Sequence, residues 1–476
     1  MNQEREITGF KMSRERLLSR MLSPALIAGL AVLVLVMGAS AGQAQTEKMI
    51  FKFAFAPGKV APGYIQVLPT TVYTKELGYG FDLGSKVTAV DRGGDDALHS
   101  GFCTSEQPFF FSVAVPEGNY DVTVTLGDPK GESITTVKAE SRRLMLERVL
   151  TPPGKFETRT FTVNVRNSKV PPPPQNAPGG SEVVLNSREQ GVLHWDDKLT
   201  LEFNNSRPCV CALEITRADD IPTMFLAGDS TVTDQTREPT TSWGQMLTRF
   251  FKSGVAIANH AESGETLKSF ISGLRLAKVL SQIKRDDYLF IQFGHNDEKK
   301  NWPQTYVDPA TTFKAYLKAF IAEARLRGAT PVIISPMERM SGANGNTHGD
   351  FPEAARQVAK EENVAFIDLH SMSKILYQAL GQNIRLAFND GTHHSKYGAY
   401  ELARCIVEGI KANKLDLAKY IADDVPAFDP AHPDPIDSLT LVASPGKDRG
   451  TVTTVPNMLT SQKNRRGARF GSWGQR

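Results

Sequence analysis

Two different rhythms of hydrophobic and polar residues divide this chain. From about Lys48 to Arg217, short runs such as 109–115 alternate in the manner of half-buried β-strands. After Pro222, apolar runs such as 224–227 are separated by helical patterns. The first rhythm predicts an all-β sandwich, and the second predicts an α/β fold with a parallel sheet covered on both faces.

Clear turn signals separate the strands of the sandwich half. Residues 116–119, Pro-Glu-Gly-Asn, lie between the runs 109–115 and 120–126, so we expect these two runs to form a β-hairpin. Later runs continue the pattern at 161–165 and 199–203. The proline- and glycine-rich stretch 171–180 cannot lie inside a strand and predicts a long exposed loop.

The second half predicts parallel strands at 224–227, 255–258, 288–293, 331–335 and 364–367. The helix before the fourth strand has clear ends, because Asp308 can cap it, Pro309 suits its first turn and Gly328 can end it. Its apolar stripe follows helical spacing at Phe313, Leu317, Phe320 and Ala324. A last helix is predicted over 397–412. In such folds, reactive groups lie on loops at the carboxyl ends of the strands.

The N-terminus has the features of a secretory signal peptide. Arg14, Arg16 and Arg20 precede an apolar stretch at 24–37, and small residues follow between 39 and 44. This stretch is short for a spanning helix of about 20 residues, and an uncleaved N-terminal anchor is the alternative. We therefore expect a secreted or periplasmic protein without stable membrane insertion after cleavage.

These patterns divide the chain into four parts. A signal peptide (1–44) precedes a β-sandwich domain (47–218), an α/β domain (222–415) and an irregular tail rich in proline (425–476). A chain of 476 residues suits two or three globular units of about 100–200 residues each. The sequence leaves the oligomeric state open.

Composition and cysteine usage restrict the partners. The 55 basic and 52 acidic residues give a net charge of only +3, which does not favour a nucleic-acid partner or an anionic membrane surface. No zinc-binding pattern occurs, and we expect neither a metal nor another cofactor. In an oxidising compartment, we expect a disulfide between Cys103 and either Cys209 or Cys211. Cys405 follows helical spacing and is expected to be a buried thiol.

Candidate chemistry is concentrated in four short motifs of the second half. They are Gly-Asp-Ser-Thr (228–231), Asn-His-Ala-Glu-Ser-Gly (259–264), Gly-His-Asn-Asp (294–297) and Asp-Gly-Thr-His (390–393). Alone, a Gly-Asp-Ser tripeptide is more often a turn or a helix cap. Together, the motifs place a serine, further hydrogen-bond donors and an Asp/His pair where ester hydrolysis needs them.

The predicted nucleophile is Ser230, which directly follows an apolar strand. A serine needs a base, and His393 can take its proton while Asp390 fixes the tautomer of the ring and stabilises the imidazolium. His394 is the alternative base. Neighbouring loop residues point in different directions, so we expect one histidine to act and favour His393.

Acyl transfer also requires donors for the negative oxygen of its tetrahedral intermediate. The backbone N–H of Ser230, the backbone N–H of Gly264 and the side-chain amide of Asn296 each follow a predicted strand, so they could converge on one pocket. The alternatives are an ordinary turn glycine and an ordinary Asx-turn asparagine. His295 and Asp297 could position Asn296 or satisfy turn backbone.

The four motifs resemble those of the SGNH, or GDSL-type, hydrolases, most closely the rhamnogalacturonan acetylesterase branch, carbohydrate esterase family 12. The resemblance covers about 223–412 and implies a three-layer α/β/α sandwich with a central parallel sheet. It implies metal-independent removal of acetyl groups from an acetylated polysaccharide, most closely pectic rhamnogalacturonan. The N-terminal half resembles galactose-binding-like modules, which implies carbohydrate contact. The implied site contains catalytic Ser230, Asp390 and His393 and an oxyanion hole of Ser230, Gly264 and Asn296.

Two departures from the family pattern affect the expected substrate. Where many relatives have a basic residue and a serine, this chain has Glu265 and Thr266, and residues 337–340 read Met-Glu-Arg-Met where relatives often carry two arginines. Both changes reduce the expected positive charge near the pocket. A broad-specificity esterase or lipase and a non-catalytic carbohydrate-binding protein are the alternatives. The absence of a long apolar segment for a lid disfavours a lipase, and the intact motifs disfavour a non-catalytic protein.

Overall fold

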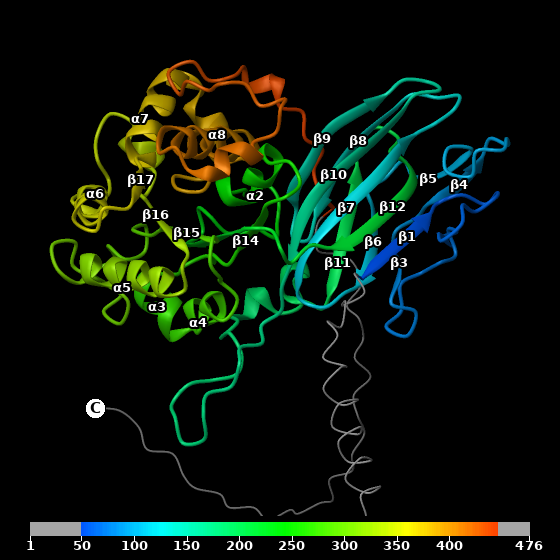
Figure 1. The fold of residues 1–476 in the computed structure, drawn as a ribbon. Coiled ribbons are helices and arrows are strands. Elements are labelled where there is room, and N and C mark those ends of the chain that lie inside the picture. The colour runs from blue at the N-terminus through cyan, green and yellow to red at the C-terminus, as the bar shows by residue number, and fades with distance from the viewer. Residues whose placement is uncertain (1–48, 446–476) are drawn as a thin grey trace, which may run out of the picture. The chain divides into compact units, whose positions relative to one another are not determined.

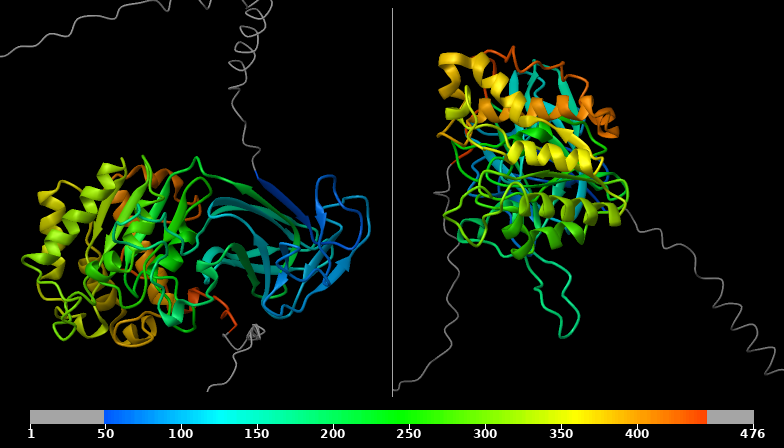
Figure 2. Two further views of the ribbon diagram at one scale, coloured as in Figure 1. Left: turned by 90° about the horizontal axis from the view of Figure 1, so that it is seen from below. Right: turned by 90° about the vertical axis from the view of Figure 1, so that its left-hand side faces the viewer.

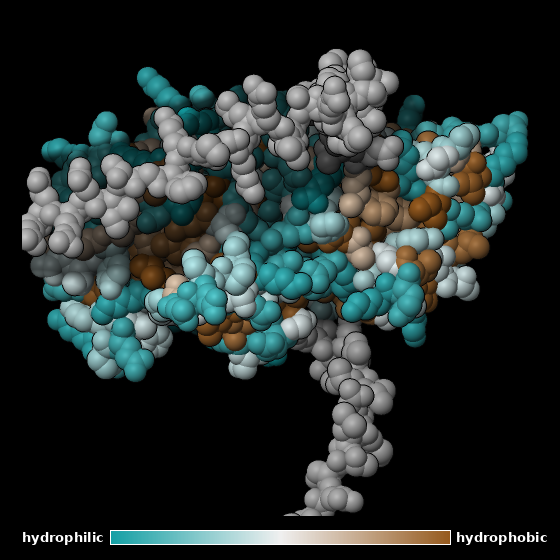
Figure 3. Space-filling view, turned by 60° about the horizontal axis from the view of Figure 1, so that its bottom comes forward, coloured by the Kyte–Doolittle hydropathy of each residue, from teal (hydrophilic) through white to brown (hydrophobic). Residues whose placement is uncertain are grey.

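The computed structural model describes residues 49–445, and the expected signal peptide (1–44) lies outside this range, as does the tail beyond 445. Within the described range, an all-β sandwich precedes a three-layer α/β/α sandwich with a parallel sheet (Figure 1), which confirms the predicted fold class. Among the described helices, none is both long and apolar enough to span a bilayer. In the space-filling view, hydrophobic surface residues form separate patches among hydrophilic ones (Figure 3).

Two sheets form the all-β part. The larger has the strand order β10 (Phe156–Val165), β7 (Gly118–Gly127), β12 (Cys209–Arg217), β1 (Ile50–Ala54) and β2 (Ile65–Gln66), and β5 (Gly101–Thr104) joins β12 and β4 (Thr88–Asp91). The smaller has the order β3 (Tyr79–Asp82), β6 (Phe109–Ala114), β11 (Lys198–Asn204), β8 (Ser133–Ala139) and β9 (Arg143–Thr151). Aromatic rings join them, since Phe53 of β1 packs edge-on against Phe111 of β6 at a centroid distance of 5.1 Å. The core of the sandwich therefore lies between the two sheets.

The predicted hairpin of 109–115 and 120–126 is wrong. Strand β6 pairs with β3 and β11, whereas β7 pairs with β10 and β12, so residues 115–117 carry the chain from one sheet to the other. Both strands present apolar residues to the same core from opposite sides. A period-two pattern shows which face is buried, but it does not distinguish neighbouring strands from facing strands. The exposed loop expected at 171–180 is present.

The expected disulfide is also wrong, because Cys103, Cys209 and Cys211 are free and buried. Val210 lies opposite Cys103 in the β5–β12 pair. Directly opposed residues point to the same face of a sheet and sequence neighbours point to opposite faces, so Cys103 faces away from Cys209. The expectation for Cys405 is confirmed: it is a buried thiol of α8, and burial raises its pKa.

The second part contains one parallel sheet with the order β14 (Ala256–Asn259), β13 (Thr223–Gly228), β15 (Tyr288–Gln292), β16 (Thr330–Ile334) and β17 (Ala365–Ile367). One face packs on α3 (Leu267–Ser272), α4 (Arg275–Leu280), α5 (Thr312–Leu326) and α6 (Phe351–Glu361). The other face packs on α2 (Trp243–Leu247), α7 (Leu369–Leu380) and α8 (Lys396–Ala412). Figure 2 shows the helices on both faces of this sheet.

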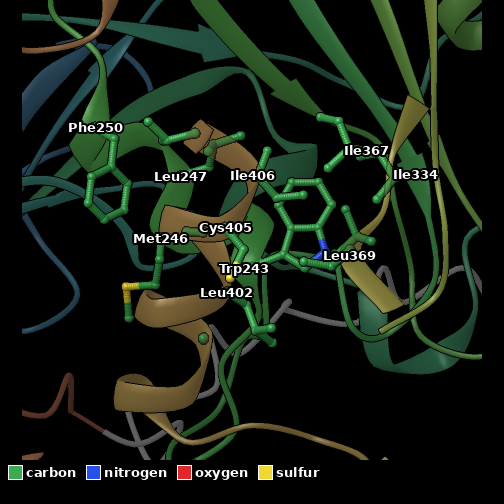
Figure 4. Close-up of a cluster of buried hydrophobic side chains, with 14 of the residues drawn as sticks. Trp243, Met246, Leu247, Phe250, Ile334, Ile367, Leu369, Leu402, Cys405 and Ile406 are labelled. Carbon is green, nitrogen blue, oxygen red and sulfur yellow. The ribbon is translucent and has the colours of Figure 1, made fainter. Parts of the chain in front are cut away.

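Alternate residues of the central strand supply these two cores. In β13, Leu226 belongs to the cluster with α2, α7 and α8, whereas its neighbour Phe225 belongs to the cluster with α3 to α6. Trp243 of α2 lies at the centre of the first cluster (Figure 4). Both faces of the strand are thus dry, which is why a buried parallel strand is an almost continuous apolar run.

The helix predicted from Asp308 begins later than expected. Its first residue is Thr312, because the Asp308 carboxylate accepts the Ala310 N–H at 3.0 Å and the Thr311 hydroxyl at 3.1 Å. These bonds close a turn in front of the helix instead of capping it. Gly328 follows the last helical turn with a φ of +76°, in agreement with its predicted role.

Candidate active site

The central strand β13 ends where the strand order of the sheet reverses, between β14 and β15. In open α/β sheets, ligands bind outside the carboxyl ends of the strands at such a switch point. Gly228 ends the strand, and a Cβ there would lie 2.6 Å from Val232 Cγ2 and 2.9 Å from Gln292 O. A glycine therefore lets the chain turn tightly against β15 and place Ser230 at this edge.

A row of three side chains begins at Ser230. The Nε2 atom of His393 lies 2.9 Å from Ser230 Oγ, and its Nδ1 atom lies 2.7 Å from Asp390 Oδ2. The other oxygen of Asp390 accepts the backbone N–H groups of Thr392 and His393, both at 2.7 Å. Burial alone raises the pKa of Asp390, but these hydrogen bonds outweigh it and lower the pKa. An ionised Asp390 favours a proton on Nδ1 and leaves Nε2 free to accept the serine proton.

The Asp-x-x-His turn by itself is not specific in this chain. His99 Nδ1 lies 2.8 Å from Asp96, and His432 Nδ1 lies 2.8 Å from Asp429, and each carboxylate also accepts a backbone N–H group from its own turn. Among the described residues, His393 is the one of these three histidines whose ring is hydrogen-bonded to a serine hydroxyl. The position of the turn in the fold, and not its spacing, sets this turn apart.

His394, the alternative base, points elsewhere. Its Nε2 atom lies 2.7 Å from the Tyr377 hydroxyl, inside the core beside α7. Burial, together with the nearby His295 and His393, lowers the pKa of His394 to about 3. Its backbone O accepts the Thr241 N–H at 3.0 Å, so His394 anchors the loop that carries His393.

The second and third motifs meet beside this row. Gly264 has a φ of +85°, a left-handed conformation that favours glycine. The Asn296 side-chain amide donates to the Glu265 O at 3.0 Å, next to Gly264, and Lys299 Nζ donates to Asn296 Oδ1 at 2.7 Å. The ammonium fixes the amide orientation, because its hydrogen bond requires an oxygen at that position. The second N–H of the amide has no acceptor among residues 49–445.

Buried carboxylates join the first three motifs. Asp229 accepts the N–H and hydroxyl of Thr231, and its Oδ2 lies 3.4 Å from His295 Nδ1. Asp297 accepts the Gly294 N–H at 3.1 Å and the Leu267 N–H at 2.9 Å. Burial, aided by the charge of Asp229, raises the pKa of Asp297 to about 8. His295 thus connects the third motif to the first, and Asp297 connects it to the start of α3.

The sandwich part also holds the serine loop, a feature that the sequence analysis missed. Arg142 Nη1 donates to Gln235 O at 3.0 Å, and Gln235 Nε2 donates to Ser230 O at 2.7 Å. The turn before β9 is unusual, because Glu140 and Arg142 have φ values of +55° and +65° without being glycines. The sequence signal for this contact is the pair of adjacent arginines, 142 and 143, in the β half of the chain.

Arg143, the second residue of this pair, reaches the second motif. Its Nε donates to Asp234 Oδ2 at 2.8 Å, and the ion pair is almost fully buried. The other oxygen of Asp234 accepts from Asn259 Nδ2 at 2.9 Å, and the same amide donates to Val232 O at 2.7 Å. The start of β9 thus positions both loops that border Ser230.

The residues that interrupt the family pattern have partners in the fold. Glu265 accepts from Ser269 Oγ at 2.6 Å and from Arg275 Nε at 3.2 Å, and Thr266 caps α3. Arg339 donates to His295 O at 3.2 Å and pairs with Glu298. Arg275 therefore pairs with Glu265 as well as with Glu189.

One group of described residues has metal-ligand chemistry: Glu189, His194 and Glu262, whose ligand atoms all lie within 4.8 Å of one another. However, Arg275 donates to Glu189 at 2.5 Å and Arg188 donates to Glu262 at 2.6 Å. Each of these carboxylates thus already accepts a hydrogen bond from an arginine. We therefore interpret this group as a buried ionic network that joins the two parts of the chain.

The fold and the site define a class, the SGNH-type α/β hydrolases, which carry a serine and its partners at the carboxyl edge of a parallel sheet. Residues 224–406 match the GDSL-like lipase/acylhydrolase family, and residues 51–169 match the galactose-binding-like domain of β-agarase and YXIM-type esterases. The chain belongs to the GDSL-like lipase/acylhydrolase family and is an enzyme.

Three relatives come from Bacillus subtilis. Probable rhamnogalacturonan acetylesterase YesY is 41% identical over 42% of this chain and 96% of its own length. Rhamnogalacturonan acetylesterase RhgT is 36% identical over 42% of this chain and 93% of its own length. The uncharacterized esterase YxiM is 25% identical but matches 80% of this chain and 95% of its own length. The match to YxiM thus extends over most of the sandwich and the α/β part.

Proposed function

We propose that this protein is a serine esterase that removes acetyl groups from an acetylated polysaccharide, with pectic rhamnogalacturonan as the first candidate. The observation that carries the proposal is the hydrogen-bonded row of Ser230, His393 and Asp390 at the switch point of the sheet. The names of YesY and RhgT support the choice of substrate. The proposed mechanism uses side chains and backbone groups of the chain itself.

In the first half-reaction, Ser230 Oγ attacks the carbonyl carbon of the acetyl ester while His393 Nε2 takes the hydroxyl proton. The tetrahedral intermediate collapses when His393 returns this proton to the sugar oxygen, which leaves as an alcohol. The acetyl group now forms an ester with Ser230. A water molecule then attacks this ester by the same route and releases acetate.

Charge develops at two places during these steps, and the proposed roles follow from them. The imidazolium at His393 is stabilised by the carboxylate of Asp390. The oxyanion is bound by the N–H groups of Ser230 and Gly264 and by the Asn296 amide. Each such donor is typically worth about 2.7–4 kcal/mol in the transition state.

The proposal also covers export of the protein and the separate roles of its two domains. We propose that residues 1–44 direct the protein out of the cytoplasm and are then removed. We also propose that residues 47–218 form the sandwich domain, that residues 222–415 form the catalytic domain, and that a tail begins at residue 425. The galactose-binding-like family match supports carbohydrate contact by the sandwich. Amino-terminal sequencing of the exported protein tests the cleavage, because an intact Met1 in the exported product would contradict it.

The central test replaces Ser230 by alanine. We expect acetate release from acetylated rhamnogalacturonan to fall by at least about 10³-fold, because the nucleophile is lost. Acetylated xylan and a small aryl acetate, measured in parallel, define the substrate range. Ser272→Ala is a matched control, since Ser272 is an exposed serine near the end of α3. Retained turnover in Ser230→Ala would reject the assigned nucleophile, and wild-type activity on the aryl ester alone would reject the polysaccharide substrate.

A further inference from the structure

A half-exposed arginine of the sandwich part lies at the edge of the candidate active site. Arg188 belongs to the short 3₁₀ helix Ser187–Glu189. Its Nε donates to Glu262 Oε1 at 2.6 Å, and its Nη2 donates to the Ser263 O. A Cβ built on Gly264 would lie 3.7 Å from the same Nη2. The guanidinium group therefore borders Gly264, one of the proposed oxyanion donors.

The backbone around Arg188 is held by contacts of residues before and after it in the chain. Its neighbour Glu189 is buried, accepts from Arg275 Nη2 at 2.5 Å and accepts from Trp195 Nε1 at 3.1 Å. The Val184 N–H donates to Gly273 O at 3.0 Å, between α3 and α4. The chain is thus attached to the catalytic domain on both sides of Arg188. These contacts fix the backbone from which the Arg188 side chain extends.

The charge of Arg188 nevertheless remains accessible. Its side chain is 54% exposed, whereas its partner Glu262 is only 6% exposed. The Glu262 carboxylate is therefore buried beneath the exposed guanidinium group of Arg188. The Nη1 atom of Arg188 makes no hydrogen bond with any described residue. A free edge of the guanidinium therefore faces solvent beside Gly264.

A second cation stands beside the other proposed donor. Lys299 Nζ contacts the amide of Asn296 and lies 3.9 Å from the ring centroid of Trp302, whose side chain is partly exposed. Positive charge thus borders the site next to both Gly264 and Asn296. These cations offset the loss of basic residues that the sequence shows at 265 and 337–340. The rim of the site is suited to an anionic ligand.

We propose that Arg188, a residue of the sandwich part, is a substrate-binding residue of the esterase site and binds a carboxylate of an acidic sugar in the polysaccharide. The inference rests on the proposed function and adds a specific contact to it. A planar guanidinium group binds a carboxylate through two parallel hydrogen bonds, a geometry that lysine cannot reproduce. The sandwich then contributes directly to the site and is more than an attached module.

The test uses the full chain and two forms of one polymer. Acetate release is measured on acetylated rhamnogalacturonan and on the same polymer with its carboxylates converted to methyl esters. For Arg188→Gln, we expect kcat/KM on the acidic form to fall by about tenfold to a hundredfold, the range for a hydrogen bond between charged groups. The loss on the methyl ester is at least about tenfold smaller, because no carboxylate is present. Arg188→Lys keeps the ion pair with Glu262 and should show an intermediate preference.

Arg159→Gln is the matched control. Arg159 is a sandwich arginine of similar exposure, 50%, in an ion pair with Glu157 of β10, and we expect its substitution to leave the activity ratio of the two polymers unchanged. Equal losses on both polymers in Arg188→Gln, or no loss on the acidic form, would overturn the inference alone. A wild-type protein that releases no acetate from either polymer would overturn both the inference and the proposed function.

Discussion

Replacing Asp390 by asparagine changes one oxygen to an N–H₂ group and tests the proposed relay. Asp390 Oδ1 accepts two backbone N–H groups and Oδ2 accepts from the His393 ring. If the asparagine oxygen keeps the two backbone bonds, its nitrogen faces Nδ1 and can bind only an unprotonated Nδ1. The ring proton then sits on Nε2, where His393 cannot accept the proton of Ser230. The opposite orientation of the asparagine amide would place its N–H₂ group against the backbone N–H groups of Thr392 and His393. This orientation is disfavoured because donors would face donors.

The size of the expected effect follows from this tautomer. Forcing the wrong tautomer in a Ser–His–Asp row costs about 10⁴-fold in kcat, or about 5.4 kcal/mol. The Asp390 side chain is 52% exposed, so water partly replaces the lost acceptor and we expect a smaller loss of about 10³-fold, or about 4 kcal/mol. Steady-state hydrolysis of an aryl acetate measures kcat and KM separately. We expect KM to change little, because Asp390 does not contact the ester.

The chain supplies a matched control for this substitution. Asp429 accepts the Ala431 N–H and lies 2.8 Å from His432 Nδ1, so Asp429→Asn makes the same chemical change in a similar turn. We expect Asp429→Asn to leave kcat unchanged. A kcat for Asp390→Asn within about tenfold of wild type would refute the tautomer argument, and an equal loss in both variants would assign the effect to folding.

Four further predictions address the supports of the site and the pH response. Arg143→Met leaves buried Asp234 without its nearest partner, so urea denaturation should show a loss of about 3 kcal/mol in the free energy of unfolding; a loss below about 1 kcal/mol would contradict this. Asn296→Ala should lower kcat by about 10²–10³-fold. Lys299→Met should lower kcat by about tenfold with partial rescue by arginine, whereas a change in KM alone would exclude a positioning role. Burial alone raises the pKa of Glu338, but hydrogen bonds from neighbouring groups outweigh it and lower the pKa from 4.5 to about 2. Its ionisation therefore stabilises the fold above pH 4.5, and this contribution is lost as the pH falls toward 2. The Tm deficit of Glu338→Gln should accordingly shrink over that range, and a deficit independent of pH would contradict the prediction.

The parallel sheet was predictable because its strands are buried on both faces. The run expected at 224–227 corresponds to β13, and that at 288–293 corresponds to β15, with ends that differ by one residue. The four motifs could be grouped because each of the first three follows a strand and the carboxyl ends of parallel strands lie at one edge. Their geometry needed the structure, since the same Asp-x-x-His turn occurs elsewhere without a serine.

The contributions of the sandwich were not predictable for a different reason. Arg142 precedes strand β9 and Arg143 is its first residue, and charged residues at a strand end usually indicate an exposed position. Their partners lie 93 and 91 residues away in the chain, and no local pattern encodes such a distance. The mistaken hairpin and disulfide share this cause, because strand pairing and strand register are set by the whole sheet.

The buried contact of Arg143 with Asp234 limits how far this enzyme can be shortened. YesY is matched over 96% of its length by 42% of this chain, so a protein of this family can exist with little more than the α/β part. Trimming the present chain to that size would leave Asp234 as a lone anion where β9 had covered it. A shortened variant would therefore need a neutral residue in place of Asp234 that still accepts the hydrogen bond from Asn259.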